Sequence, residues 1–124
     1  MRGRGWRWLP ALAHAALIFY LSHQPQWPFA PPQILGVDKL LHLAAFAALA
    51  ALILFALGEQ GATPGGRALV AVLGVGWGVL DELHQAFVPG RFADPWDALA
   101  DALGVLLVLA VHFAWSRGRA RTTG

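Results

Sequence analysis

Residues 81–101 read DELHQAFVPGRFADPWDALAD, and this stretch joins two apolar segments through a short loop that contains Pro and Gly. It holds five of the seven acidic residues of the chain. Ionisable groups beside membrane-type sequence are costly and usually serve a function. We therefore expect the functional residues of this chain to gather around this stretch, whose acids are Asp81, Glu82, Asp94, Asp97 and Asp101.

The composition of the chain is that of a membrane protein. Of its 124 residues, 57% are hydrophobic and 13% are charged, against roughly 45–50% and about 25% in typical soluble domains. This length predicts a single domain over residues 1–124. The absence of Cys excludes a disulfide scaffold, a thiolate nucleophile and a Cys-ligated metal. The Arg residues concentrate at the two ends and form no basic face, so we expect no nucleic-acid partner.

Four apolar segments, separated by breakers, predict an all-α fold. A stretch with four Pro residues at 23–37, a Gly-rich stretch at 58–66 and the Pro89-Gly90 pair interrupt them. Asp38 and Asp94 are the expected N-caps of the second and fourth helices, with Pro95 at the first helical position of the fourth. The expected helices span about 6–22, 38–57, 67–88 and 95–115.

We interpret these helices as an integral membrane bundle of four transmembrane helices. Both ends of the chain are rich in Arg. An even number of spans places both ends on one side, and the positive-inside rule makes that side cytoplasmic. The predicted topology is therefore N-in and C-in, with the lipid bilayer as the principal partner. A homo-oligomer remains open, because 124 residues supply few helices.

This topology delivers polar residues from three helices to one depth near the outer surface. Residues four apart share a helix face, and each helix carries such a pair. Gly74 and Gly78 continue the face of helix 67–88 that carries Asp81 and Gln85, and this small-xxx-small motif is typical of close contact between membrane helices. The three pairs are Asp38 with His42, Asp81 with Gln85, and Asp97 with Asp101.

Several roles follow for these residues. Glu82, His42 and Asp81 are the candidates for proton transfer, and we expect Asp38 to orient His42. Lys39 and Arg91 are able to hold a phosphate or carboxylate. The full set of expected ligand-binding residues is Lys39, Arg91, Gln85, Asp38, Asp97 and Asp101.

Two further interpretations stay open. His42, Glu82 and Asp101 are able to supply mixed nitrogen and oxygen ligands to a metal, although no H-x-x-x-H or H-E-x-x-H spacing supports one. The sequence therefore leaves the metal and any other cofactor unknown. Alternatively, the whole cluster is a structural network that hydrogen-bonds the helices together or docks a partner.

The sequence DKLLHLAAFAALA at 38–50, followed by DELHQAFVPGRFADPWDALADALG at 81–104, resembles the VanZ-like family of small bacterial membrane proteins. The elements D-K-x-x-H and D-E-x-x-Q-x-F-x-P-G-R carry the resemblance, and Ser22 and Pro25 match a further Ser and Pro element weakly. Asp101 stands where the family pattern usually has Asn. The resemblance implies a location in the bacterial cytoplasmic membrane and a role in the cell envelope, since relatives are linked to teicoplanin resistance.

Two functions are consistent with these observations. The first is an outward-facing polar pocket that binds or acts on an envelope lipid, a lipid-linked phosphate or a glycopeptide-like ligand. The second is a non-catalytic membrane module in which the polar cluster packs helices or docks a partner. The sequence does not decide whether the protein is an enzyme.

Overall fold

The computed structural model describes residues 3–25 and 36–122, and all regular secondary structure within them is helical. The four predicted helices are present, which confirms the all-α fold. Trp27 and Phe29, whose rings suit the headgroup region of a bilayer, lie outside the described residues together with most of the Pro-rich stretch. The elements are the 3-10 helix η1 (Gly5–Trp8), α1 (Leu9–His23), α2 (Val37–Leu57), the 3-10 helix η2 (Gly58–Ala62), α3 (Pro64–Gln85) and α4 (Pro95–Thr122).

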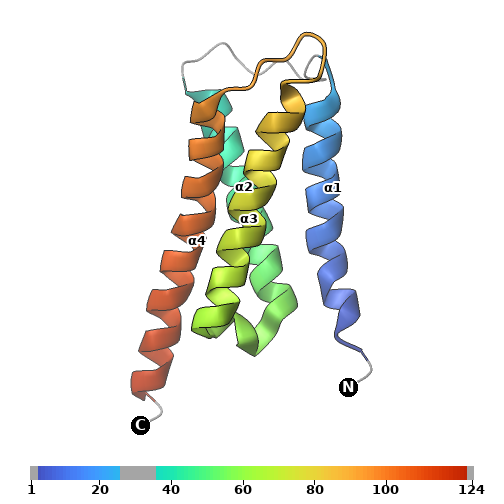
Figure 1. Ribbon diagram of the computed structural model, residues 1–124. Coiled ribbons are helices and arrows are strands. Elements are labelled where there is room, and N and C mark those ends of the chain that lie inside the picture. The colour runs from blue at the N-terminus through green and yellow to red at the C-terminus, as the bar shows by residue number, and fades with distance from the viewer. Residues whose placement is uncertain (1–2, 26–35, 123–124) are drawn as a thin grey trace.

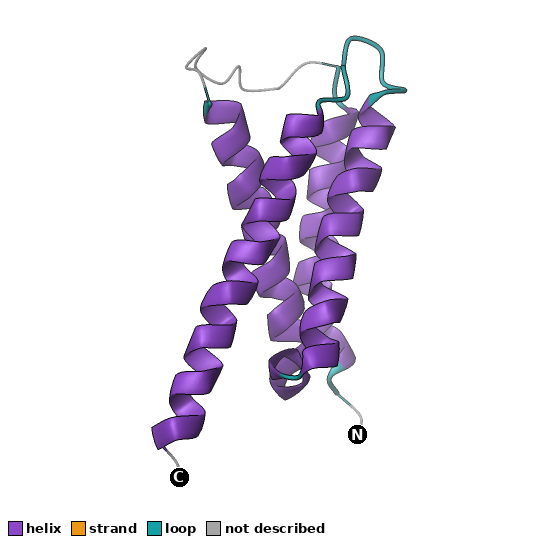
Figure 2. Ribbon diagram, turned by 60° about the vertical axis from the view of Figure 1, so that its left-hand side comes forward, coloured by secondary structure: helices purple, strands orange, loops and turns teal. Residues whose placement is uncertain are grey.

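The helices lie side by side and alternate in direction along the chain (Figure 1). The ends of α1 and α3 and the starts of α2 and α4 lie together, and we call this end of the protein the site end. The η2 turn and both termini lie at the opposite end, as Figure 2 shows from a second direction. All segments that carry the expected site residues therefore reach the same end of the protein.

The helices approach one another closely where small residues face a neighbour. A Cβ added to Gly104 of α4 would overlap the Leu43 carbonyl oxygen of α2, and one added to Gly74 of α3 would lie 2.7 Å from Val105 Cγ2. Gly78 faces Phe46 and Asp101 in the same way. The predicted close-packing face of α3 is confirmed, and α4 packs most extensively against α2. Phe46 and Val105, which face these glycines, are fully buried.

Helix boundaries differ from the predicted ones where capping differs. Gly36, with a φ of 90°, is the N-cap of α2, so Asp38 lies in the first turn and is not the cap. The α3 helix begins at Pro64 because the Thr63 hydroxyl accepts the Gly66 N–H at 2.9 Å. It ends at Gln85, three residues earlier than predicted, and α4 continues seven residues further than predicted, to Thr122.

The cap of α4 is the predicted one. Asp94 Oδ1 accepts the Trp96 N–H at 2.9 Å. The carbonyl of Asp94 also accepts the first backbone hydrogen bonds of the helix, from Asp97 and Ala98. Asp94 and Pro95 therefore begin α4 as the sequence indicated.

The outer surface of the bundle suits a lipid environment. Within the described residues, Val37–Ala62 and α4 are long and apolar enough to cross a membrane, with mean hydropathies of 2.6 and 2.0. Only 33% and 22% of their most apolar windows are buried by the rest of the protein, whereas the core helix of a soluble protein is mostly buried. Large apolar side chains such as Leu107 and Val111 remain more than half exposed. These features indicate a membrane protein.

Candidate functional site

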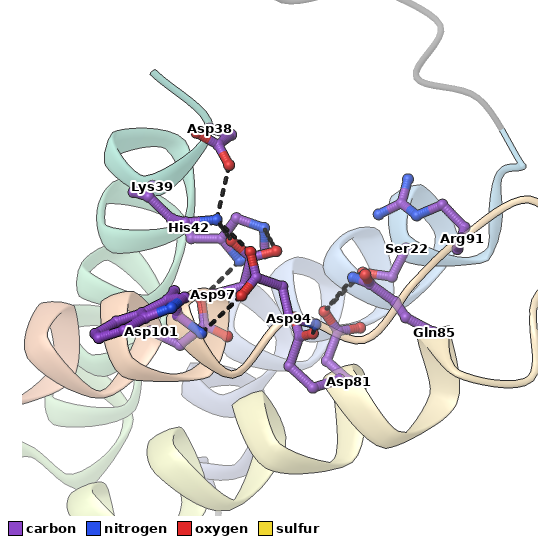
Figure 3. A network of polar contacts seen from close by, with 12 residues as sticks. Ser22, Asp38, Lys39, His42, Asp81, Gln85, Arg91, Asp94, Asp97 and Asp101 are labelled. Carbon is purple, nitrogen blue, oxygen red and sulfur yellow. Dashed lines mark hydrogen bonds and ion pairs between the residues drawn. The ribbon is translucent and has the colours of Figure 1, made fainter. Parts of the chain in front are cut away.

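Polar side chains from all four helices meet at the site end (Figure 3). Four acidic or amide side chains are at least nine-tenths buried there, which is rare for these residue types unless they are paired. They are Asp81, Glu82, Gln85 and Asp101. The predicted polar residues of α2, α3 and α4 therefore lie close together, and Ser22 of α1 joins them.

His42 on α2 faces two carboxylates of α4. Its Nδ1 lies 2.9 Å from Asp101 Oδ1, and its Nε2 lies 3.5 Å from Asp97 Oδ2. Asp97 and Asp101 are one helical turn apart, so a single face of α4 presents both. The expected pairing of Asp38 with His42 is wrong, because Asp38 bonds to Lys39 and the carboxylates of α4 orient the imidazole.

Lys39 lies among three carboxylates at the site end. Its Nζ donates to Asp38 Oδ2 at 2.8 Å, to Asp94 Oδ2 at 2.7 Å and to Asp97 Oδ1 at 2.5 Å. The Lys39 ammonium, with the Trp96 N–H, holds the pKa of Asp94 below its usual value. All three donors of this ammonium are used, so Lys39 ties the start of α2 to the start of α4.

Asp81 on α3 is held by a separate part of the network that includes α1. The Ser22 hydroxyl donates to Asp81 Oδ2 at 2.7 Å. Gln85 Nε2 lies 3.4 Å from both the Ser22 hydroxyl and Asp81 Oδ2. These bonds connect the last turn of α1 to the last turns of α3.

Glu82 is buried, although its place near the end of α3 also allowed a water-exposed side chain. The residue is only 6% exposed. Its Oε2 accepts the backbone N–H of Asp94 at 2.9 Å, across the loop between α3 and α4. This bond directs Glu82 inward, towards His42 and Asp101, so that one ligand atom from each of the three residues lies within 4.8 Å of the others.

Three carboxylate oxygens of the site are buried and lack a hydrogen-bond partner within the part of the chain that the structure describes. They are Asp81 Oδ1, Glu82 Oε1 and Asp101 Oδ2. Native proteins rarely leave buried polar atoms unsatisfied, and each exception requires an explanation. Each of these carboxylates has a partner on its other oxygen, so one oxygen of each remains to be satisfied.

Two cavities that share lining residues lie at the site. A cavity of about 410 Å³ opens at the site end, and a smaller one of about 50 Å³ reaches inward to Ser22 and Asp81. His42, Gln85 and Arg91 line both. Two larger cavities, of about 560 and 820 Å³, lie away from this network and are lined mainly by apolar side chains.

Arg91 differs from Lys39 in its surroundings. Its Nη1 donates to the Gln24 carbonyl at 3.3 Å. It forms no ion pair with any described residue, although it lines the same cavity as Asp38, Asp94 and Asp97. Arg91 is therefore the cationic side chain of this cavity whose charge the protein leaves unpaired within the described residues.

Sequence reasoning missed Ser22 as a site residue. The weak match of Ser22 and Pro25 to a family element was the only available signal, since a lone Ser at the end of an apolar helix carries little information. It also missed the contact between His23 Nδ1 and His84 Nε2, at 3.0 Å. That pair joins α1 to α3 beside the site.

A comparison with known protein families matches residues 7–116 to the family described as VanZ/LLP1. The match includes every site residue from Ser22 to Asp101. No curated protein and no solved structure matches the chain significantly.

Proposed function

Because this match covers most of its length, the chain belongs to the VanZ/LLP1 family, and from that premise we propose that it is a multi-pass protein of the bacterial cytoplasmic membrane that binds an anionic ligand of the cell envelope. The ligand class is an envelope lipid, a lipid-linked phosphate or a glycopeptide-like molecule with a carboxylate. Binding takes place at the outer surface, in the cavity of about 410 Å³.

The helix directions support a bundle with more than two spans. The two candidate spans include α2 and α4, and both run away from the site end (Figure 1). If both cross the membrane in the same direction, α3 must cross back between them. The remaining helix α1 lies alongside, and the Arg residues at its start lie at the same end of the protein as those at the end of α4. The positive-inside rule then favours both termini in the cytoplasm and the site end outside.

Arg91 is the residue that we expect to bind the anionic group of the ligand. A guanidinium recognises phosphate and carboxylate through paired hydrogen bonds. Arg91 is partly buried in the cavity and free of ion pairs within the described residues, so it is available for such a group. Lys39 is already surrounded by three carboxylates, so its charge is not available to a ligand. His42 lines the same cavity and is positioned to exchange a proton with a bound ligand. Glu82 lies behind it, with a carboxylate oxygen within 4.8 Å of an imidazole nitrogen.

Binding to purified protein tests this proposal. We expect full-length protein in lipid nanodiscs to bind a polyprenyl phosphate, and Arg91→Gln to weaken the affinity at least about tenfold, the loss of one charge-assisted contact. Arg67→Gln is the matched control, because Arg67 lies on α3 near the opposite end and packs over the Phe113 ring. A soluble glycopeptide serves as the second probe. Equal affinities of Arg91→Gln and the parent protein for both probes would refute the proposal.

A second function remains supported by the hydrogen bonds between helices. The Ser22–Asp81 and His42–Asp101 contacts join α1 to α3 and α2 to α4, which a non-catalytic packing or docking module also requires. Glu82→Gln separates the two, because it keeps size while removing a charge. Loss of an envelope-antibiotic phenotype, with the variant folded and expressed normally in a strain lacking its own copy, supports the ligand site. Full retention of the phenotype by Glu82→Gln supports the packing module, provided that larger residues at Gly74 or Gly78 abolish the phenotype.

A further inference from the structure

We propose that His42, Glu82 and Asp101 bind a divalent transition-metal cation at the inner end of the site. This inference goes beyond the anionic ligand and does not depend on its identity. One ligand atom from each residue lies within 4.8 Å of the other two, and the residues come from α2, α3 and α4. Three helices therefore hold the donor set in place.

Each carboxylate of this set has an oxygen that the protein leaves unpaired. Glu82 is fixed through Oε2 by the Asp94 N–H, while Oε1 has no partner among the described residues. Asp101 Oδ1 contacts His42 Nδ1 at 2.9 Å, while Oδ2 has no partner among the described residues. The two residues are 6% and 0% exposed, so bulk water does not satisfy these oxygens. A cation bound between them would satisfy both.

The distances fit coordination after a small adjustment. Neighbouring donors on an ion with bonds of about 2.1 Å lie about 3 Å apart, and opposite donors lie about 4.2 Å apart. His42 Nδ1 and Asp101 Oδ1 lie 2.9 Å apart. The donors of the three residues lie within 4.8 Å of one another. A pair in opposite positions therefore closes by at most about 0.6 Å and a neighbouring pair by at most about 1.8 Å, which side-chain rotation supplies.

The surroundings of His42 match those of a metal ligand. Imidazole ligands usually donate their second nitrogen to a carboxylate, which fixes the ring. When His42 Nδ1 binds the cation in place of its contact with Asp101 Oδ1, Nε2 faces Asp97 Oδ2 at 3.5 Å. Asp97 is in turn held by Lys39, whose Nζ lies 2.5 Å from Asp97 Oδ1. Asp97 is thus a positioning residue, and the Lys39 cluster is part of the support for the metal site.

Charge also favours a cation here. Asp81, Glu82 and Asp101 are buried together, and the nearest ammonium, that of Lys39, is occupied by three other carboxylates. One imidazole with two carboxylates suits Mn²⁺, Fe²⁺ or Zn²⁺ better than an all-oxygen ion such as Ca²⁺. His42 lines the cavity that opens at the site end, which provides an entry path.

Metal binding to the full-length protein tests this inference. Protein in detergent is freed of metal with a chelator and titrated with Mn²⁺, and the electron paramagnetic resonance signal of free Mn²⁺ is measured. We expect one Mn²⁺ per chain and displacement by Zn²⁺. Glu82→Gln and Asp101→Asn should each weaken binding at least about 100-fold, and Asp97→Asn about 10- to 100-fold. Glu59→Gln, in the η2 turn at the opposite end, should bind as the parent does.

A spectroscopic measurement keeps the test decisive if a variant is unstable. Bound Mn²⁺ in the parent protein should show a nitrogen coupling from one imidazole, and His42→Gln should abolish it. The inference is overturned if the folded parent protein takes up no Mn²⁺ or Zn²⁺ below about 1 mM, the weak limit of specific protein sites. It is equally overturned if both carboxamide variants retain parental affinity. The metal titration contains no anionic probe. A failure to bind metal therefore does not affect the test of ligand binding by Arg91.

Discussion

The Ser22 hydroxyl donates a 2.7 Å hydrogen bond to Asp81 Oδ2, and both residues are at most 6% exposed. This bond joins the last turn of α1 to α3, whereas much of the remaining surface of α1 is open, with Leu12, Leu17 and Tyr20 at least half exposed. A helix with little buried surface depends strongly on its few specific contacts. Ser22 therefore anchors α1 at the site end.

Ser22→Ala should loosen this anchor. It leaves Asp81 Oδ2 with only the longer contact from Gln85, and we expect a loss of about 1–2 kcal/mol in the free energy of unfolding. The measurement is reversible unfolding of the full-length protein in mixed micelles. Ser116→Ala is the control, because that hydroxyl bonds only to the Phe113 carbonyl in its own helix. If the two variants unfold alike, the Ser22–Asp81 bond does not stabilise α1.

Glycine positions give a second prediction with an internal control. Gly104→Ala places a Cβ against the Leu43 carbonyl, where backbone cannot yield easily, and Gly76→Ala meets nothing within 4 Å. Overpacking of this kind should lower the free energy of unfolding of Gly104→Ala by about 1–3 kcal/mol. At Gly76 the change should be neutral or stabilising by up to about 1 kcal/mol, because Ala favours helix. Thermal unfolding of the two variants measures the difference, and equal melting temperatures would mean that α2 and α4 are not in close contact.

The fold could be predicted largely because Pro and Gly interrupt apolar runs at the points where the helices end. Asp94 and Pro95 supply both features of a helix start, a capping side chain and Pro at the first helical position, and they predict the start of α4 correctly. Thr63 and Pro64 formed a similar signal, but Gly65 and Gly66 suggested a continued break. The structure includes both glycines in α3, where any side chain at Gly66 would overlap the Gln60 carbonyl.

The sequence predicts most of the residues that meet at the site end, but not which of them pair. The residues were identified because charges in apolar sequence are conspicuous. Their partners were not, because spacing along one helix cannot show which residue of another helix lies opposite. Asp38 and His42 share a face by spacing, yet His42 turns to Asp101. Ser22 was missed for the same reason, since its partner lies 59 residues away.

The acid at the start of α4 provides a prediction about pH. The Lys39 ammonium holds the pKa of Asp94 below its ordinary value of 3.8. A carboxyl whose pKa is lowered on folding adds stability above pH 3.8 and loses that contribution as pH falls through the lowered value. We expect Lys39→Gln to raise the pKa of Asp94 towards 3.8, as measured by carbon-13 NMR of the labelled carboxyl. Lys39→Arg should keep it low, and an unchanged pKa in Lys39→Gln would show that Lys39 is not the cause.

The membrane topology can be tested directly, because the chain contains no Cys and each introduced thiol is therefore unique. Phe92 lies in the loop at the site end and is 88% exposed. Gly3 and Gly118 lie near the opposite end, where no described side chain lies within 4 Å of an added Cβ. With four spans and both termini inside, an impermeant maleimide applied to intact cells should label Phe92→Cys. It should label Gly3→Cys and Gly118→Cys only after permeabilisation. Labelling of Gly3→Cys on intact cells would mean that α1 does not cross the membrane, since α2 to α4 alone would leave the N-terminus outside.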